Sequence, residues 1–172
     1  MYQNYIFDFY GTLADIRTDE ELPGLWEKMS EIYAAMGAHY EPEELRLSFR
    51  GLIRERIGTE NAEPDLSKAF TGLYVAKGVH CDALQAKMTA IFFRAMSRKF
   101  IRTYDGVKEL LRELRERGRG VYLLSNAQTD FTRPEIEMLG LTSCFDGIFI
   151  SSEQGCKKPA REFFEGLLKH FH

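Results

Sequence analysis

The sequence predicts an α/β protein in which a helical bundle is inserted into a unit built on a parallel sheet. Short apolar runs that end in polar residues occur near the N-terminus and twice after residue 103. The two later runs alternate with amphipathic helices, a pattern typical of parallel strands joined by crossovers. Between residues 16 and 102 the apolar residues instead follow a helical period. We therefore expect a core formed by residues 1–15 and 103–172 and a helical cap formed by residues 16–102.

The first expected element is a buried strand over Tyr5 to Phe9, a short apolar run. Asp8 lies near its end, and Gly11 and Thr12 then break the strand into a loop. Burying an ionised carboxylate is costly unless it is paired. We therefore expect Asp8 to point into a crevice at the carboxyl edge of the sheet, where open α/β sheets bind ligands. A solvated aspartate at a strand exit is the alternative.

Four amphipathic segments with short links follow, and they predict a small helical bundle. Their inner faces carry methionine and aromatic residues, which we expect to form the core of the bundle rather than a cofactor site. Proline or glycine begins or ends three of the segments. The four run from Leu22 to Met36 with Pro23 near the start, from Pro42 to Ile57 with Gly58 after it, from Pro64 to Gly78, and from Asp82 to Met96.

Beyond residue 102 helices and strands alternate. Because parallel strands share a carboxyl edge, the polar residues that end each strand are expected beside Asp8. We expect strands at 120–124 and 147–150, ending at Ser125-Asn126 and Ser151-Ser152, and helices at 103–118, 134–139 and 160–171, the first capped by Thr103 or Asp105.

A basic turn with Lys157, Lys158 and Pro159 precedes the last of these helices. An aspartate, a hydroxyl and a lysine around one crevice suit nucleophilic attack on an anionic substrate, since the lysine screens the repulsion between negative charges. Each residue alone is a weak signal, because serine is a common helix cap and lysine is commonly solvated. The combination therefore carries the prediction.

The composition limits the classes of molecule that the protein is expected to bind. The 23 basic and 26 acidic residues are interspersed, so no basic stripe indicates nucleic-acid binding, and charges interrupt every stretch that could span a membrane. We expect a small anionic molecule as the partner. Three cysteines without a Cys-x-x-Cys spacing and an N-terminus without a signal-peptide pattern indicate a reduced, cytoplasmic protein.

Three motifs in this order resemble the haloacid dehalogenase superfamily, a group dominated by phosphatases. Asp8 to Thr12 resembles its first motif, Leu124-Ser125-Asn126 its second and Lys158-Pro159 its third, and the helical insertion sits where that family carries a mobile cap. The resemblance covers nearly the whole chain. It implies a Rossmann-like core and a hydrolase in which Asp8 attacks the substrate and water hydrolyses the aspartyl intermediate.

The resemblance also implies roles for individual residues. Asp8, Tyr10 and Lys158 would be catalytic. Mg²⁺ would be bound by the Asp8 carboxylate and the backbone carbonyl of Tyr10. The substrate anion would be bound by Gly11, Thr12, Ser125, Asn126 and Lys158.

Tyr10 departs from the phosphatase pattern, because phosphatases of the family usually place a second aspartate there as general acid. A phenol, with a pKa of ~10, is a poor base at neutral pH. The first motif therefore resembles the 2-haloacid dehalogenase branch more closely, in which halide leaves without a proton. The helical segment shows no motif for the halide-binding set of that branch; its candidates are Trp26, Arg46, Arg50 and Arg54.

The family's fourth motif, a strand ending in Gly-Asp, does not follow the last expected helix. We therefore expect a fragment or an early-terminated version of a longer enzyme, with too few carboxylates for tight Mg²⁺ binding. The first strand would keep an unpaired edge, open to self-association. The leading prediction is a phosphatase acting on a small phosphorylated metabolite. A 2-haloacid dehalogenase and a non-catalytic or truncated protein of this fold are the alternatives.

Overall fold

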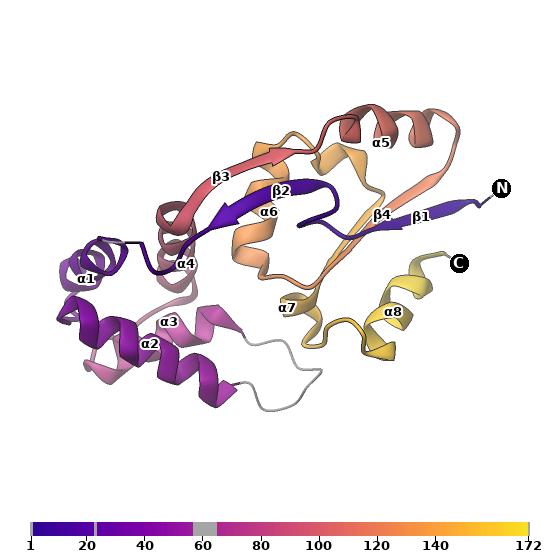
Figure 1. The fold of residues 1–172 in the computed structure, drawn as a ribbon. Helices are drawn as coiled ribbons and strands as arrows, with labels where there is room; N and C mark the ends of the chain where they lie inside the picture. The colour runs from indigo at the N-terminus through magenta and orange to yellow at the C-terminus, as the bar shows by residue number, and fades with distance from the viewer. Residues whose placement is uncertain (1, 23, 57–64, 172) are drawn as a thin grey trace. The chain divides into compact units, whose positions relative to one another are not determined.

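The computed structural model describes residues 2–22, 24–56 and 65–171 (Figure 1). These residues form two compact units, one that runs to Arg17 and resumes at Phe100, and one that extends from Thr18 to Lys99. The boundaries lie within a few residues of the predicted ones. The assignment of the two units as catalytic core and cap stays a prediction.

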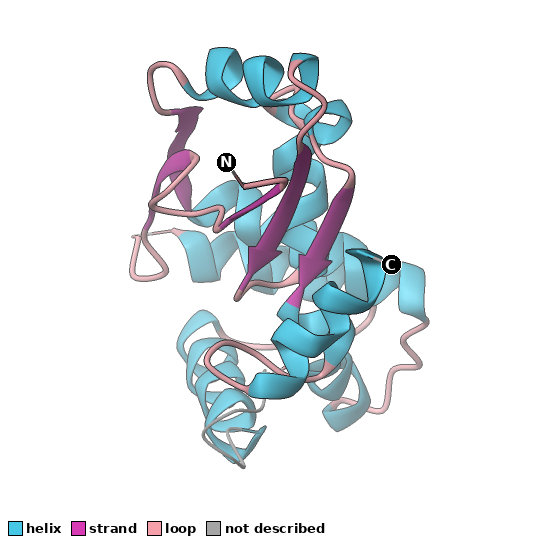
Figure 2. Cartoon of the chain, turned by 90° about the vertical axis from the view of Figure 1, so that its right-hand side faces the viewer, coloured by secondary structure: helices cyan, strands magenta, loops and turns pink. Residues whose placement is uncertain are grey.

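The first unit is built on a parallel sheet of three strands in the order β1-β4-β5 (Figure 2). Its strands are β1 (Asn4–Phe7), β4 (Gly120–Ser125) and β5 (Gly147–Ile150). In the register, Phe7 lies opposite Leu123, and Leu124 opposite Phe149. Among the described residues, β1 pairs with β4 alone. The predicted α/β fold with a parallel sheet is confirmed.

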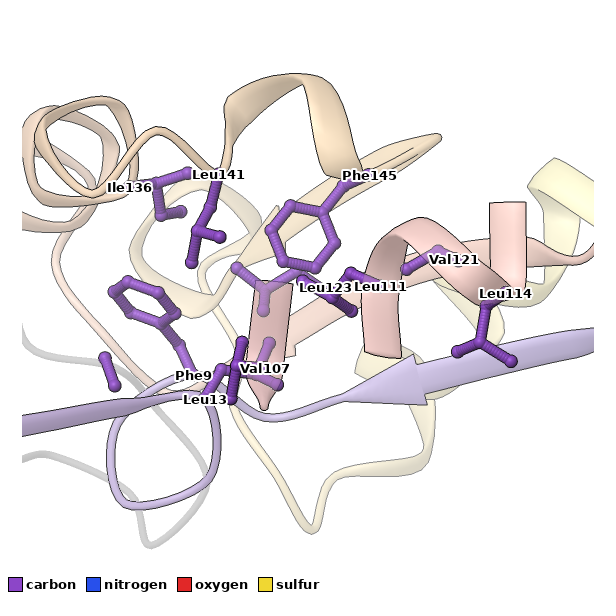
Figure 3. Close-up of a cluster of buried hydrophobic side chains, with 11 residues drawn as sticks. Phe9, Leu13, Val107, Leu111, Leu114, Val121, Leu123, Ile136, Leu141 and Phe145 are labelled. Carbon is purple, nitrogen blue, oxygen red and sulfur yellow. The ribbon is translucent and has the colours of Figure 1, made fainter. Parts of the chain in front are cut away.

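Helices cover both faces of this sheet, because side chains along a strand alternate between the two faces. Val121 and Leu123 of β4 pack on the face of α5 (Val107–Glu116) and α6 (Thr129–Met138), in the cluster drawn in Figure 3. Leu124 packs on the opposite face against α8 (Arg161–Leu168). The sheet is therefore the middle of three layers, and its carboxyl edge stays available for a site.

The strand β1 ends at Phe7, two residues earlier than predicted. Asp8 is thus the first residue beyond the strand, and Phe9, predicted to lie in the strand, is fully buried in the loop. The carbonyl of Phe9 accepts hydrogen bonds from the amides of Thr12, Leu13 and Ala14. The ring of Phe9 is buried in the hydrophobic cluster shown in Figure 3, where it packs with Leu13. The chain turns at Phe9 because burial of this ring directs the backbone away from the strand.

A two-stranded sheet of β2 (Ala14–Thr18) and β3 (Arg98–Thr103) was not predicted. Residues 16–102 were expected to be helical throughout, so the prediction is wrong at both ends of that range. Both strands are short and rich in charged residues, which hides a strand period from apolar patterning. Arg102 and Asp15 form an ion pair, with 2.8 Å between Nη2 and Oδ2.

In the second unit, the residues that the structure describes form four helices, as predicted. They are α1 (Leu25–Ala35), α2 (Pro42–Arg56), α3 (Leu66–Ala76) and α4 (Ala83–Ser97). Their inner faces form an aromatic core with ring contacts among Trp26, Phe49, Phe70 and Phe93. The predicted boundary residues Pro23, Ile57, Gly58 and Pro64 lie outside the described residues.

The start of α5 differs from the prediction. The helix begins at Val107, and its N-cap is Gly106 in the left-handed conformation, with φ of 80° and no side-chain cap. Thr103 and Asp105 therefore do not cap it, and Thr103 is instead the last residue of β3. The sequence signal was misleading because Thr and Asp favour caps only when the backbone of the next residues turns into the helix there.

The helix α6 begins at Thr129, five residues before the predicted start at Pro134. Pro134 lies inside the helix, where its missing N–H removes one backbone hydrogen bond. Ser151 and Ser152 were predicted to end a strand but begin the short helix α7 (Ser151–Gln154). The last predicted helix is divided into α8 and a 3₁₀ turn, η2 (Lys169–Phe171); another 3₁₀ turn, η1 (Thr142–Cys144), precedes β5.

The described residues bear on two predictions, that the chain has no membrane-spanning segment and that its cysteines are reduced. None of the helices formed by residues 2–22, 24–56 and 65–171 is both long and apolar enough to cross a membrane. Cys81, Cys144 and Cys156 are free thiols, each partly exposed. The cytoplasmic location stays a prediction.

Candidate active site

Asp8 lies directly after β1, at the carboxyl edge of the sheet. Its side chain is 42% exposed, and its Oδ1 lies 3.0 Å from Nζ of Lys158. The same oxygen accepts a hydrogen bond of 2.8 Å from the amide of Phe9. A pair that is this exposed adds little to stability. Its importance is positional, because it places a cation beside a reachable carboxylate.

Lys158 is held from three directions. Its Nζ donates to the carbonyl of Leu124 at 2.9 Å, close to the end of β4. Asn126 binds its backbone twice: Oδ1 accepts from the Lys158 amide at 2.7 Å, and Nδ2 donates to the Lys158 carbonyl at 3.0 Å. The predicted residues Asp8, Asn126 and Lys158 therefore lie together. Asn126 was predicted to bind the substrate anion, but in this structure its side chain positions Lys158.

Ser125, the last residue of β4, is 1% exposed. Among the described residues its Oγ has no hydrogen-bond partner. A buried hydroxyl without a partner costs free energy unless another group completes it. Its position at the carboxyl edge is compatible with the predicted contact to a substrate oxygen.

The serines after β5 hold the neighbouring loop together. Ser151 Oγ accepts from the amide of Ala127 at 2.8 Å and donates to its carbonyl at 3.1 Å. Ser152 Oγ accepts from the amide of Thr129 at 2.8 Å. Sequence reasoning placed these hydroxyls at the correct edge. Only the structure shows that they fasten the loop between β4 and α6.

Gly11 and Thr12 form the tip of the loop after Asp8, and both are exposed. Gly11 has φ of +76°, in the left-handed region that side chains rarely adopt. A Cβ at this position would meet nothing within 4 Å, so the backbone conformation rather than crowding requires glycine. The amide of Gly11 donates to the carbonyl of Ala14 at 2.9 Å, which closes the turn.

The hydroxyl of Tyr10 is bound to helix α6. It donates to Oε2 of Glu135 at 2.5 Å and lies 3.1 Å from Oγ1 of Thr132. Glu135 is 2% exposed and Thr132 is fully buried. Sequence reasoning missed both residues. Their signal was spacing: Phe131, Thr132, Glu135 and Ile136 share the inner face of α6, which places a carboxylate at a core position.

The described residues do not by themselves complete a magnesium site. They contain no cluster of three or more His, Cys, Asp or Glu residues that could hold a metal ion. The predicted ligands, the Asp8 carboxylate and the Tyr10 carbonyl, would supply two oxygen atoms, whereas Mg²⁺ takes six ligands in octahedral geometry. The remaining ligands would have to come from water, substrate or other parts of the chain.

Three of the candidate halide-binding residues in the helical unit have other partners. Trp26 packs among phenylalanine rings, and its Nε1 donates to the carbonyl of Glu20 at 2.9 Å. Arg46 pairs with Glu43 and Glu21, and Arg50 pairs with Glu21. Arg54, the fourth candidate, is exposed.

Comparison with curated proteins gives one relative. A segment of 60 residues is 42% identical to the sesquiterpene phosphatase astK of Aspergillus oryzae, and it covers 35% of this chain. The segment spans 31% of that relative's length. Because the match covers less than a third of the relative, any shared activity or substrate is a proposal for this chain.

Solved structures show the same fold at low sequence identity. A haloacid dehalogenase-type phosphatase from Thermococcus onnurineus has a TM-score of 0.58 at 15% identity, over 99% of this chain and 72% of the other. A predicted phosphoglycolate phosphatase from Haemophilus somnus has 0.50 at 20% identity, over 99% and 72%. The L-2-haloacid dehalogenase of Xanthobacter autotrophicus, with chloropropionic acid covalently bound, has 0.50 at 17% identity, over 99% and 65%.

The family model matches residues 2–172, nearly the whole chain, and describes a haloacid dehalogenase-like hydrolase. The fold comparisons agree with it, since phosphatases and a dehalogenase share this architecture. The family predicted from the three motifs is therefore confirmed, as is the assignment to the hydrolases. The chain belongs to the haloacid dehalogenase-like hydrolases.

Proposed function

We propose that this chain carries a phosphatase site in which Asp8 is the nucleophile and a small phosphorylated metabolite is the substrate. The observation that carries the proposal is the pair of Asp8 and Lys158, 3.0 Å apart at the carboxyl edge. A carboxylate attacking a phosphate would meet strong repulsion. The fixed ammonium group of Lys158 reduces it, and its own position is set by Leu124 and Asn126.

The proposed reaction has two steps. A carboxylate oxygen of Asp8 attacks phosphorus, the bond to the ester oxygen breaks, and the leaving alkoxide takes a proton from water. The hydroxide that remains is neutralised by the proton that the attacking water releases in the second step. Water then attacks the aspartyl phosphate, which releases inorganic phosphate and restores the carboxylate. Lys158 screens charge in both steps, and the buried hydroxyl of Ser125 is proposed to donate to a phosphate oxygen.

The relative from Aspergillus oryzae supports phosphate chemistry, as its name describes a phosphatase. The dispersed charges support a small anionic substrate rather than nucleic acid. Mg²⁺ is proposed as the cofactor, with the Asp8 carboxylate and the Tyr10 carbonyl as its ligands from the described residues. When bound, such an ion would neutralise charge on the transferring phosphoryl group.

A 2-haloacid dehalogenase is the second candidate, and Tyr10 favours it. The hydroxyl of Tyr10 donates its hydrogen bond to Glu135, so it is not placed to protonate a leaving alkoxide. Halide leaves without a proton and makes no such demand. Against this candidate, Trp26, Arg46 and Arg50 are engaged with residues of the helical unit itself.

One assay separates the two candidates. Phosphate release from a panel of phosphomonoesters is measured with and without Mg²⁺, beside chloride release from 2-chloropropionate. We expect Mg²⁺-dependent phosphate release. Chloride release that survives chelation of the metal would instead establish the dehalogenase.

The variant Asp8→Asn tests the nucleophile, because it keeps the shape of the side chain and removes its charge. We expect turnover to fall by at least about 10³-fold, as for loss of a central catalytic group. Asp105→Asn is the matched control, since Asp105 is exposed in the same unit, and its turnover should be unchanged. Equal activity of wild type and Asp8→Asn would refute the mechanism, and inactivity of both would indicate a non-catalytic protein.

A further inference from the structure

A buried polar cluster ties the nucleophile loop to a helix that no motif includes. Tyr10, two residues after Asp8, donates its phenolic proton to Oε2 of Glu135 at 2.5 Å. Since that hydroxyl has a single proton, Thr132 is the donor in the 3.1 Å contact between its Oγ1 and the Tyr10 oxygen. The three side chains thus form a chain of hydrogen bonds from α6 to the loop.

The carboxylate of Glu135 is unusual for its place, because it is 2% exposed and comes from the inner face of α6. Burial of a charged group is unfavourable unless hydrogen bonds compensate it. A hydrogen bond to an ionised acceptor is shorter and stronger than one between neutral groups. A separation of 2.5 Å fits such a bond, so the cluster can hold Tyr10 more firmly than a neutral contact would.

Helix α6 provides a fixed support for this contact. The amide of its first residue, Thr129, donates a hydrogen bond of 2.8 Å to Oγ of Ser152 in α7. Arg133 pairs with Glu153 of α7, with 2.6 Å between Nε and Oε1. Ile136, next to Glu135, is buried in the core of Figure 3. Glu135 therefore lies on a helix, α6, whose residues before and after it are held by contacts with other parts of the α/β unit.

The loop has little other freedom between this anchor and Asp8. Phe9, which separates Asp8 from Tyr10, is fully buried, and its amide donates to the Asp8 carboxylate. Gly11 turns the chain directly after Tyr10. A shift of the Tyr10 side chain would therefore be transmitted to the backbone that carries Asp8.

We propose that Glu135 is a positioning residue, which acts through the hydroxyl of Tyr10 to fix the loop that presents Asp8. The kinetic part of this inference rests on the proposed function. Tyr10 then tethers the loop to α6, although its position in the first motif is the one at which phosphatases of the family usually carry a general acid. Small errors in the placement of reacting groups lower the rate of the chemical step more than they lower the affinity for substrate.

The kinetic test compares Tyr10→Phe, Glu135→Gln, the double variant and Glu137→Gln. Glu137 is the matched control, because it lies on α6 two residues away but is exposed. We expect kcat to fall about 10- to 100-fold in Tyr10→Phe and Glu135→Gln, with KM changed by less than about twofold. The double variant should lose no more than the stronger single variant, since Tyr10→Phe removes the contact that Glu135→Gln weakens by replacing a charged acceptor with a neutral one.

Two kinetic outcomes would overturn the proposal. One is losses in the single variants that multiply in the double variant, which would mean that the residues act independently. The other is an unchanged kcat in folded Glu135→Gln, even if its melting temperature falls, since Glu135 would then be structural only. All kcat values are measured below the onset of unfolding of each variant.

Hydrogen exchange gives a readout that needs no turnover. Amide exchange in peptides covering residues 9–14 should become faster in Tyr10→Phe and Glu135→Gln and stay unchanged in Glu137→Gln. Unchanged exchange in Tyr10→Phe, which lacks the hydroxyl, would refute the tether. If the wild type releases no phosphate, the proposed function fails, but this measurement still decides whether Glu135 holds the loop.

Discussion

Tyr33 and Tyr10 show how differently the two units use a tyrosine. Tyr33 in the helical unit is fully buried, stacks on Tyr74 with ring centroids 4.2 Å apart, and donates to the carbonyl of Phe70 at 3.1 Å. Tyr10 in the α/β unit donates to the buried carboxylate of Glu135 at 2.5 Å. The first contact satisfies a hydroxyl within an apolar core, and the second joins a loop to a helix.

The difference extends to the surroundings of each residue. The helical unit is held by aromatic packing, and the polar atoms of its core bind backbone carbonyls or hydroxyls. In the α/β unit, polar side chains bridge the loops after β1, β4 and β5, as Lys158, Ser151 and Glu135 do. Substitutions in the helical unit should therefore affect stability, and those in the α/β unit should affect activity.

The largest stability effect is expected from Phe93→Ala. Phe93 is 1% exposed and contacts the rings of Trp26, Phe49 and Phe70. Truncating such a ring leaves a cavity, and we expect the free energy of unfolding to fall by about 3–5 kcal/mol. Phe92→Ala is the control, because Phe92 is 38% exposed.

Chemical denaturation followed by the fluorescence of Trp26 measures this effect, since the chain has one tryptophan and it lies in the helical unit. Equal losses in the two variants would contradict the picture of a single aromatic core on one side of α4.

In the α/β unit, a large effect on activity is expected from Lys158→Ala. Loss of the ammonium group beside Asp8 should lower kcat/KM by about 10²- to 10³-fold, as for removal of one preorganised electrostatic group. Lys157→Ala removes the preceding charge and serves as the control. Phosphate release measures both. A loss of equal size in the two variants would indicate a general effect of charge rather than a contact with Asp8.

The buried tyrosines predict a loss of stability in alkali. Burial raises the pKa of Tyr33 above its ordinary value near 10. Above about pH 10 the unfolded chain releases this proton while the folded chain keeps it, so the stabilisation present at lower pH is lost as the pH rises. The slope for one group approaches about 1.4 kcal/mol per pH unit.

Denaturation of wild type and Tyr33→Phe at pH 9 and pH 11 tests this sign. The variant should be less stable at pH 9, because it lacks the hydrogen bond to Phe70, and should lose less on going to pH 11. Burial also raises the pKa of Tyr74, so part of the dependence of stability on pH should remain in the variant. Parallel pH profiles would show that Tyr33 does not titrate with unfolding.

The smallest expected effect concerns self-association through β1. This strand carries no charge, Ile6 is 45% exposed, and β4 is its sole strand partner among the described residues. Uncharged edge strands pair with other chains. Ile6→Lys should shift the concentration at which oligomers form upward by several-fold, as measured by light scattering. A wild type that stays monomeric at all concentrations would refute self-association through β1.

The sequence predicted much of the α/β unit because its strands are continuous apolar runs closed by polar residues. Gly120–Ser125 and Gly147–Ile150 appear as strands almost where expected. The pairing of β2 with β3 was not predictable, because a ribbon of charged residues has no apolar signal. Topology predicted that Asp8 and Lys158 would lie at one edge, whereas Glu135, the partner of Tyr10, lies on the inner face of α6 and belongs to no motif.

By itself the sequence determined the family, the α/β class and the residues at the ends of the strands, since apolar period and motif order are local properties of the chain. Tertiary structure alone decided that Asn126 binds the backbone of Lys158 and that Tyr10 donates to Glu135. These contacts depend on angstrom-scale distances between elements far apart in sequence. Such distances are set by how the α5 and α6 layer packs on the sheet, and no local pattern encodes them.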